Sequence, residues 1–452
     1  MSRIHHVRRR LLVGFLAVAG FGIPAAPAAD PTLQELDQKI RILERKLEID
    51  QENAAAQTAP TVSAGSDGFA IVSADKAYQL KMHGYLQTDA RFYFNDPEDK
   101  SVDTFLVRRA RLIFDGRFGE DFEMRIAPDF GNNKTELQDG YLDYKPDPRV
   151  NVRMGYTKVP FGLERLQSSS ETFFNETALS TALTPNSDTG LVLYGTLGKG
   201  ILDYAAGVYN GVPDGASVFT DSDDAKDLVG RVFLSPFKNT GPDVLRGLSF
   251  GIAGTVGDRQ GSDSNPNLPS YRTCGQQSFF NYKTSTNKAS TAFADGEQVR
   301  VAPQFYYTLG SFGLLGEYIL SEQEVANGKS SDSLDNSGWQ LTASQVLTGE
   351  SPSLKGVKPL RPYNPAKGDW GAIELALRYS ELTFDDQAFD AGYADPKKSA
   401  SSAEAVGVGV NWYLTCNVKL VLNYEQTTFT DGASDGDRPD EQIVIARAQF
   451  KF

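Results

Sequence analysis

Basic side chains at alternate positions of strand-like segments are the residues of this sequence best suited to chemistry. Arginine stays charged at neutral pH, and its planar fork donates two parallel hydrogen bonds, which suits phosphate oxygens. Several such groups along one path, each binding weakly, pass an anion from site to site. In strand-like segments, successive side chains point to opposite faces. The arginines predicted to face the interior include Arg91, Arg109, Arg111, Arg125, Arg153, Arg231, Arg300 and Arg378.

The same polar face also carries carboxylates, among them Asp89, Asp129 and Glu425. The alternative function of the arginines is therefore structural, as partners of these carboxylates in a network that lines a lumen. Arg108 directly precedes Arg109, so in a regular strand its side chain points to the outer face. It therefore lies at a rim or a subunit contact, or a local β-bulge turns it inward.

Residues for catalysis or metal binding are scarce. Of 3 histidines, only His83 lies beyond the basic N-terminus, and no GxSxG motif accompanies it. Cys274 and Cys416 offer neither zinc spacing nor a disulfide framework. The net charge of −13 argues against a nucleic-acid binder. We expect that the protein is not an enzyme and that it binds neither a cofactor nor a metal ion.

The elements that position these residues are predicted to be long amphipathic strands. From Tyr78, the segment YQLKMHGYLQTDARFYF alternates apolar and polar residues, and similar segments follow to the end. About sixteen strands, with short turns and long polar loops in alternation, predict a closed transmembrane antiparallel β-barrel over residues 78–452. One of the long polar loops is expected over residues 324–337. The many glycines and aromatic residues fit turns and aromatic girdles. A soluble β-sandwich is the alternative, but it has no reason to segregate its loop lengths.

The residues before the barrel divide into three predicted parts. Residues 1–29 have the basic start, short apolar run and small-residue site of an export signal peptide. Residues 30–53 form a periplasmic helix with apolar heptad positions, for which a trimeric coiled coil is preferred and a lone amphipathic helix is the alternative. Residues 54–77, rich in small residues, predict a flexible linker.

One long insertion, from Lys158 to Gly190, interrupts the strand pattern. A strand-poor loop of this length is uncommon unless it is functional or disordered. We expect it to fold inward and narrow the pore, so that charges facing it across the lumen decide what passes.

Three stretches resemble the phosphate-selective porin family, porins O and P: KVPFGLERLQSS at 158–169, the stretch from GWQLTASQVLTGE to GDWGAIELALRYS at 338–380, and RRAR at 108–111. The resemblance implies a trimer of sixteen-stranded barrels in the bacterial outer membrane, with loop 3 inside and a path that favours phosphate or polyphosphate. By this analogy Arg108, Arg109 and Arg111 are anion contacts, and Lys158 and Arg165 are candidates on the loop. Many members of the family have arginine where Ser187 stands, and the loop also carries the acids Glu164, Glu171, Glu176 and Asp188. Both departures weaken the expectation of strict phosphate selectivity.

These observations together predict a passive outer-membrane channel for small anions, with phosphate or pyrophosphate favoured. Its expected partners are a homotrimer, outer-membrane lipid with lipopolysaccharide, and inorganic anions. The alternatives are a general or carbohydrate-type diffusion porin and a surface barrel with a plugged lumen.

Overall fold

The computed structural model describes residues 32–94, 101–220, 223–285, 290–328 and 330–452, and the chain divides into two units at Ala59. The predicted signal peptide, residues 1–29, lies outside the described residues. Helix α1 (Leu33–Thr58) belongs to the first unit. No helix in the described part of the chain combines the length and apolar character required to cross a bilayer. The apolar heptad residues of α1 are all solvent-exposed: Leu33, Leu36, Ile40, Leu43 and Leu47.

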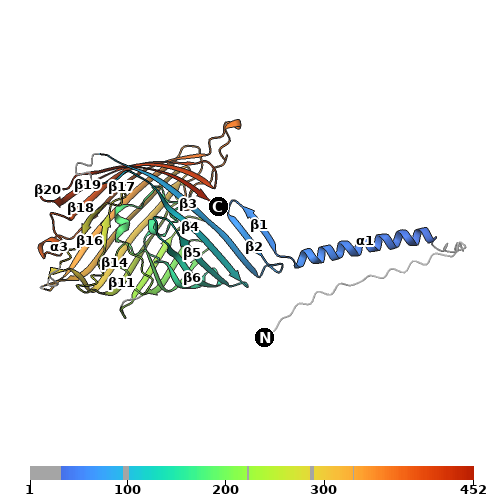
Figure 1. The fold of residues 1–452 in the computed structure, drawn as a ribbon, viewed down its shortest axis with the longest axis horizontal. Helices are drawn as coiled ribbons and strands as arrows, with labels where there is room; N and C mark the ends of the chain where they lie inside the picture. The colour runs from blue at the N-terminus through green and yellow to red at the C-terminus, as the bar shows by residue number, and fades with distance from the viewer. Residues whose placement is uncertain (1–31, 95–100, 221–222, 286–289, 329) are drawn as a thin grey trace. The chain divides into compact units, whose positions relative to one another are not determined.

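The second unit is built on one large antiparallel sheet (Figure 1). Of its 19 strands, β1, β2 and β20 lie outside the wall, which leaves 16 wall strands among the described residues. These wall strands are β3 (Tyr78–Phe94), β4 (Thr104–Phe118), β5 (Phe122–Asp129), β6 (Glu136–Asp147), β7 (Val150–Lys158), β8 (Ser187–Leu197), β9 (Leu202–Tyr209), β10 (Asp227–Leu234), β11 (Ser249–Gln260), β14 (Phe293–Leu309), β15 (Phe312–Ala326), β16 (Ser331–Val346), β17 (Ala372–Thr383), β18 (Ala400–Tyr413), β19 (Val418–Ala433) and β21 (Glu441–Lys451).

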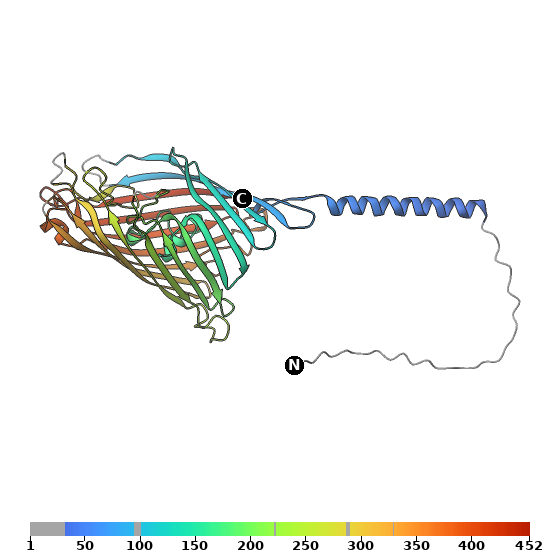
Figure 2. The same ribbon diagram turned by 90° about the horizontal axis from the view of Figure 1, so that it is seen from below.

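The sheet closes on itself because the last strand pairs with the first. β21 lies antiparallel to β3, from Gln442 opposite Phe94 to Lys451 opposite Tyr85. Two views show the strands as tilted ribbons around one interior (Figure 1, Figure 2). Closure removes the free sheet edges that a bilayer does not tolerate. The predicted closed barrel of sixteen strands is confirmed.

Side chains alternate across the wall with the apolar face outward. In β17, Leu375 and Leu377 are 41% and 58% exposed, whereas Glu374, Ala376 and Arg378 between and beside them are buried. This arrangement is the reverse of a soluble protein and is typical of a barrel whose outer face meets lipid.

Short turns and longer loops alternate along most of the wall, and one connection differs from the prediction. A polar loop was expected over residues 324–337, but β15 and β16 continue to pair up to Ala326 opposite Ser331. In this extension the outward residues, such as Glu324 and Ser333, are polar and the inward residues Val325 and Leu334 are apolar and buried, so the pattern is the reverse of the lipid-facing wall while the backbone pairing continues.

The linker predicted over residues 54–77 also differs from the structure. Helix α1 continues to Thr58, and β1 (Thr61–Gly65) and β2 (Gly68–Val72) form a hairpin. β2 pairs with β3, with Phe69 opposite Met82, on the side of β3 where β21 has ended. The small-residue composition hid this hairpin because Gly65 and Gly68 belong to a turn rather than to a linker.

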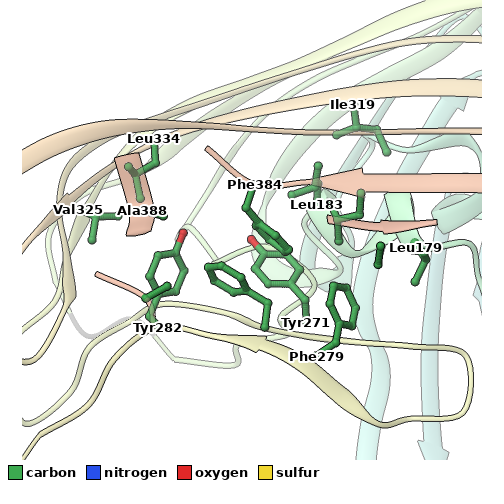
Figure 3. Close-up of a cluster of buried hydrophobic side chains, with 14 of the residues drawn as sticks. Leu179, Leu183, Tyr271, Phe279, Tyr282, Ile319, Val325, Leu334, Phe384 and Ala388 are labelled. Atoms are coloured by element: carbon green, nitrogen blue, oxygen red, sulfur yellow. The ribbon is translucent and has the colours of Figure 1, made fainter. Parts of the chain in front are cut away.

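Part of the barrel interior is filled by an apolar cluster (Figure 3). Tyr271 and Phe279 come from the hairpin of β12 (Ser270–Arg272) and β13 (Ser278–Asn281), which lies in the connection between β11 and β14. They pack against Phe384 and against Leu179 and Leu183 of the 3-10 helix η1 (Leu179–Leu183). The cluster fills part of the lumen, and its β12–β13 hairpin and η1 also border the first cavity described below.

Candidate functional site

Loop 3, defined here as residues 159–186 between β7 and β8, lies inside the barrel. It contains the short helix α2 (Leu163–Leu166) and η1. Its backbone is held by side chains of wall strands far apart in sequence. The carbonyls that accept these hydrogen bonds are those of Phe161, Ser169, Ser170, Thr172, Phe173, Asn175 and Glu176. The predicted inward fold of the loop is confirmed.

A β-bulge in β4 turns two adjacent arginines toward the same interior. The register between β3 and β4 shifts at Gln87, which faces Arg109, while Thr88 faces Val107. Arg108 is the extra residue, and its guanidinium contacts loop 3. Of the alternatives left open for Arg108, the bulge is the one that the structure adopts.

Glu176 of loop 3 is the shared partner of this arginine cluster. Arg108 binds it with a fork, with Nε 2.7 Å from Oε1 and Nη2 3.0 Å from Oε2. Arg91, Arg447 and Arg109 also approach its carboxylate, at 3.0, 3.3 and 3.7 Å. Burial by itself raises the pKa of Glu176, but Arg108 and Arg109 hold the pKa well below its ordinary value. The carboxylate is therefore ionised at neutral pH.

Lys158 and Arg165 are basic groups with no carboxylate within salt-bridge distance among the described residues. The Lys158 ammonium donates to the carbonyls of Arg165 and Gln167. Arg165 donates through Nε to the Thr184 hydroxyl (2.9 Å) and through Nη2 to the carbonyl of Thr181 (2.8 Å). Burial lowers the pKa of Arg165 to about 10, which leaves the guanidinium charged at neutral pH. Both groups retain donors for a solute.

These groups converge on a cavity of about 480 Å³ beside loop 3, called the external cavity here because residues of the external connections border it. All five residues implied by the family resemblance line it, namely Arg108, Arg109, Arg111, Lys158 and Arg165. Lys134 and Arg272 add two further cations, against the four carboxylates Asp129, Glu136, Glu164 and Glu176. A chain that is acidic as a whole thus lines this cavity with seven basic and four acidic side chains. Such an excess attracts anions.

A second cavity, of about 600 Å³, lies toward the barrel end that carries the short turns. Arg125 and Arg231 line it, as do Lys355 and Lys451. Gln167 lines both cavities, so loop 3 forms part of the wall between them. A solute crossing the barrel passes this loop.

The other predicted site residues have structural contacts. Arg153 pairs with Asp143 at 2.8 Å, and Arg378 pairs with Glu425 at 2.6 Å. Arg300 is 1% exposed and pairs with Asp214 at 2.6 Å. None of these three arginines lines either cavity, and neither does Arg91. For these four, the structure agrees with the structural-network alternative.

Sequence reasoning missed several residues of the site. Lys134 and Arg272 lie in external connections, and Arg272 belongs to the β12–β13 hairpin that borders the cavity. Glu176 was expected only as one of the loop acids that weaken phosphate selectivity, and its pairing with the arginine cluster was missed. Loops have no period from which a side-chain direction follows, so the only available signal was the position of Glu176 within the inserted loop.

A search against protein-family models matches the phosphate-selective porin O and P family over residues 80–452. Porin O of Pseudomonas aeruginosa is 24% identical over 422 residues, covering 85% of this chain and 91% of that protein.

Among solved structures, the outer-membrane channel DcaP of Acinetobacter baumannii is similar, with a TM-score of 0.55 and 13% identity over 83% of this chain and 98% of that one. The OmpF structure of Salmonella typhi, in complex with daunomycin, has a TM-score of 0.52 and 11% identity over 83% and 98% of the two chains. At these identities the two structures support the barrel fold alone. The family match covers most of the chain, and with it come the outer-membrane location and a non-enzymatic channel activity. The chain belongs to the phosphate-selective porin O and P family and is a bacterial outer-membrane porin.

Proposed function

We propose that this porin favours small anions, with inorganic phosphate and pyrophosphate as its preferred solutes. One observation carries the proposal. Lys158 and Arg165 line the external cavity, and neither has a carboxylate within salt-bridge distance among the described residues. Arg108, Arg109 and Arg111 line the same cavity. Fixed guanidinium and ammonium donors stabilise phosphate oxygens through charge-assisted hydrogen bonds. The description of the family, phosphate-selective porin O and P, points in the same direction.

The proposed path runs from the external cavity past loop 3 into the second cavity, where Arg231 and Arg125 are the next cations. Arg231 donates to the Gln304 side chain and has no carboxylate within salt-bridge distance among the described residues. Conduction requires sites that bind an anion weakly enough to release it. Two cavities in series, each with a modest basic excess, meet that requirement.

A less selective diffusion porin is the second candidate. The observation that favours it is the pairing of predicted pore arginines with carboxylates within 4 Å, for Arg91, Arg108, Arg109, Arg111, Arg125, Arg153, Arg300 and Arg378. Paired arginines contribute less to anion attraction because the neighbouring carboxylate cancels their charge at a distance.

Single-channel recording in planar bilayers separates the two candidates. The reversal potential in a KCl gradient measures the preference for anions over cations. Titration of phosphate into a chloride solution blocks the chloride current, and the concentration dependence of this block gives the affinity for phosphate. We expect an anion-preferring pore with a saturable phosphate block. An unselective pore that phosphate does not block would remove the anion proposal and favour general diffusion.

We also propose a homotrimer in which α1 forms a coiled coil with its copies in the periplasm. The apolar heptad residues of α1 are 44% to 88% exposed in the single chain, and a helix of this kind gains stability by burying them against partners. The apolar outer face of the barrel is proposed to contact outer-membrane lipid and lipopolysaccharide. Chemical cross-linking of the detergent-solubilised protein tests the trimer.

A further inference from the structure

The arginine cluster at the external cavity already holds an anion, and that anion is part of the chain. Arg91, Arg108, Arg109 and Arg447 gather around the carboxylates of Glu176 and Asp89, so this cluster has four basic groups and two acidic ones. The forked contact from Arg108 to Glu176 is the arrangement that arginine also makes with phosphate. Arg108, Arg109 and Glu176 all border the cavity.

We propose that Glu176 is a tethered competitor for anions, which occupies the fork of Arg108 and so keeps a second anion site, next to Lys158 and Arg165, closed to solutes. The inference rests on the proposed preference for anions. In this account the carboxylate reduces the affinity of the cavity in two ways. It fills donors that a solute would use, and its negative charge opposes the approach of an anion.

Loop 3 has anchors besides this carboxylate. The backbone of residues next to Glu176 is held by wall side chains, with Asn423 accepting from the Asn175 amide (2.7 Å) and Arg378 donating to the Glu176 carbonyl (2.9 Å). Asn411 donates to the carbonyl of Phe173 at 2.9 Å. A change confined to the carboxylate therefore alters charge while these anchors remain. This separation makes the proposal testable by substitution.

The test is Glu176→Gln in the full-length porin, with phosphate block of chloride current as the measurement. Glutamine keeps the volume and one carbonyl acceptor for Arg108 but removes the charge. We expect phosphate affinity to rise roughly tenfold, because one opposing charge is lost beside a cavity whose protein walls focus the field of the remaining basic groups. The reversal potential in KCl should move further toward that of an anion-selective pore. Asp243→Asn, which removes one negative charge on an exposed turn, should leave affinity within about twofold.

Two further variants separate charge from loop displacement. Glu176→Asp keeps the charge, so it should retain a phosphate affinity close to that of the wild type. In the double variant Arg108→Gln with Glu176→Gln the fork is absent, and the gain should disappear. This double variant removes both members of the ion pair. If Glu176→Gln alone does not form barrels, the phosphate affinity can still be measured in the double variant.

The proposal is refuted if Glu176→Gln leaves the affinity unchanged, if Glu176→Asp raises it equally, or if the double variant keeps the full gain. A rise in conductance with loss of anion preference would refute it too, since the carboxylate would then be an anchor of the loop. A wild-type pore without phosphate block would instead contradict the proposed function. The reversal potentials of the variants would still report whether Glu176 opposes anions.

Discussion

Replacing Arg165 with glutamine is the most direct test of the proposed anion site. Arg165 has no carboxylate within salt-bridge distance among the described residues, and its Nη1 group has no hydrogen-bond partner there. A hydrogen bond to a charged group contributes about 1.5–3 kcal/mol. A loss of about 2 kcal/mol corresponds to a roughly 30-fold weaker phosphate affinity, at 1.4 kcal/mol per factor of ten. Glutamine can still donate to the Thr181 carbonyl, which preserves one loop contact.

The assay is phosphate block of chloride current through single channels at constant neutral pH. Arg246→Gln is the matched control, since it removes the same charge from a turn residue whose side chain is 58% exposed. Arg165→Lys keeps the charge but loses the fork, so its affinity should lie between that of the wild type and that of Arg165→Gln. An affinity within twofold of the wild type in Arg165→Gln would refute the assignment of Arg165 to the anion path.

Three further outcomes follow from the same structure. Arg231→Gln should weaken the block by about 1 kcal/mol, roughly fivefold, when phosphate is added from the short-turn side, and no change would remove the second cavity from the path. Ile40→Asp on α1 should reduce trimer yield on cross-linking, whereas an unchanged yield would exclude a stabilising coiled coil. Arg300→Met should destabilise the barrel by about 3–5 kcal/mol because buried Asp214 loses its partner. Heat-induced gel mobility shifts measure this, with exposed Arg149→Met as the control that should change little.

The sequence by itself determined the wall of this protein. A strand has a side-chain period of two, so alternation over segments such as Tyr78–Phe94 indicated both the strands and their lipid-facing and lumen-facing sides. Lipid on one side and water on the other make this alternation strict, and for that reason Arg109, Arg111 and Arg125 could be assigned to the interior. The length of the insertion between β7 and β8 likewise indicated a loop with a function.

Only the tertiary structure decided which inward charges are available to a solute. Arg111 and Arg300 have the same type and the same inward parity, yet one borders a cavity and the other is enclosed by Asp214 and its neighbours. The difference comes from the loops, because Asp214 and Glu176 reach the wall from segments without periodicity. Arg108 faced inward only through a register shift, which depends on pairing with β3. Closure of the barrel brings these distant segments together, and pairings made across the lumen leave no local pattern in the sequence.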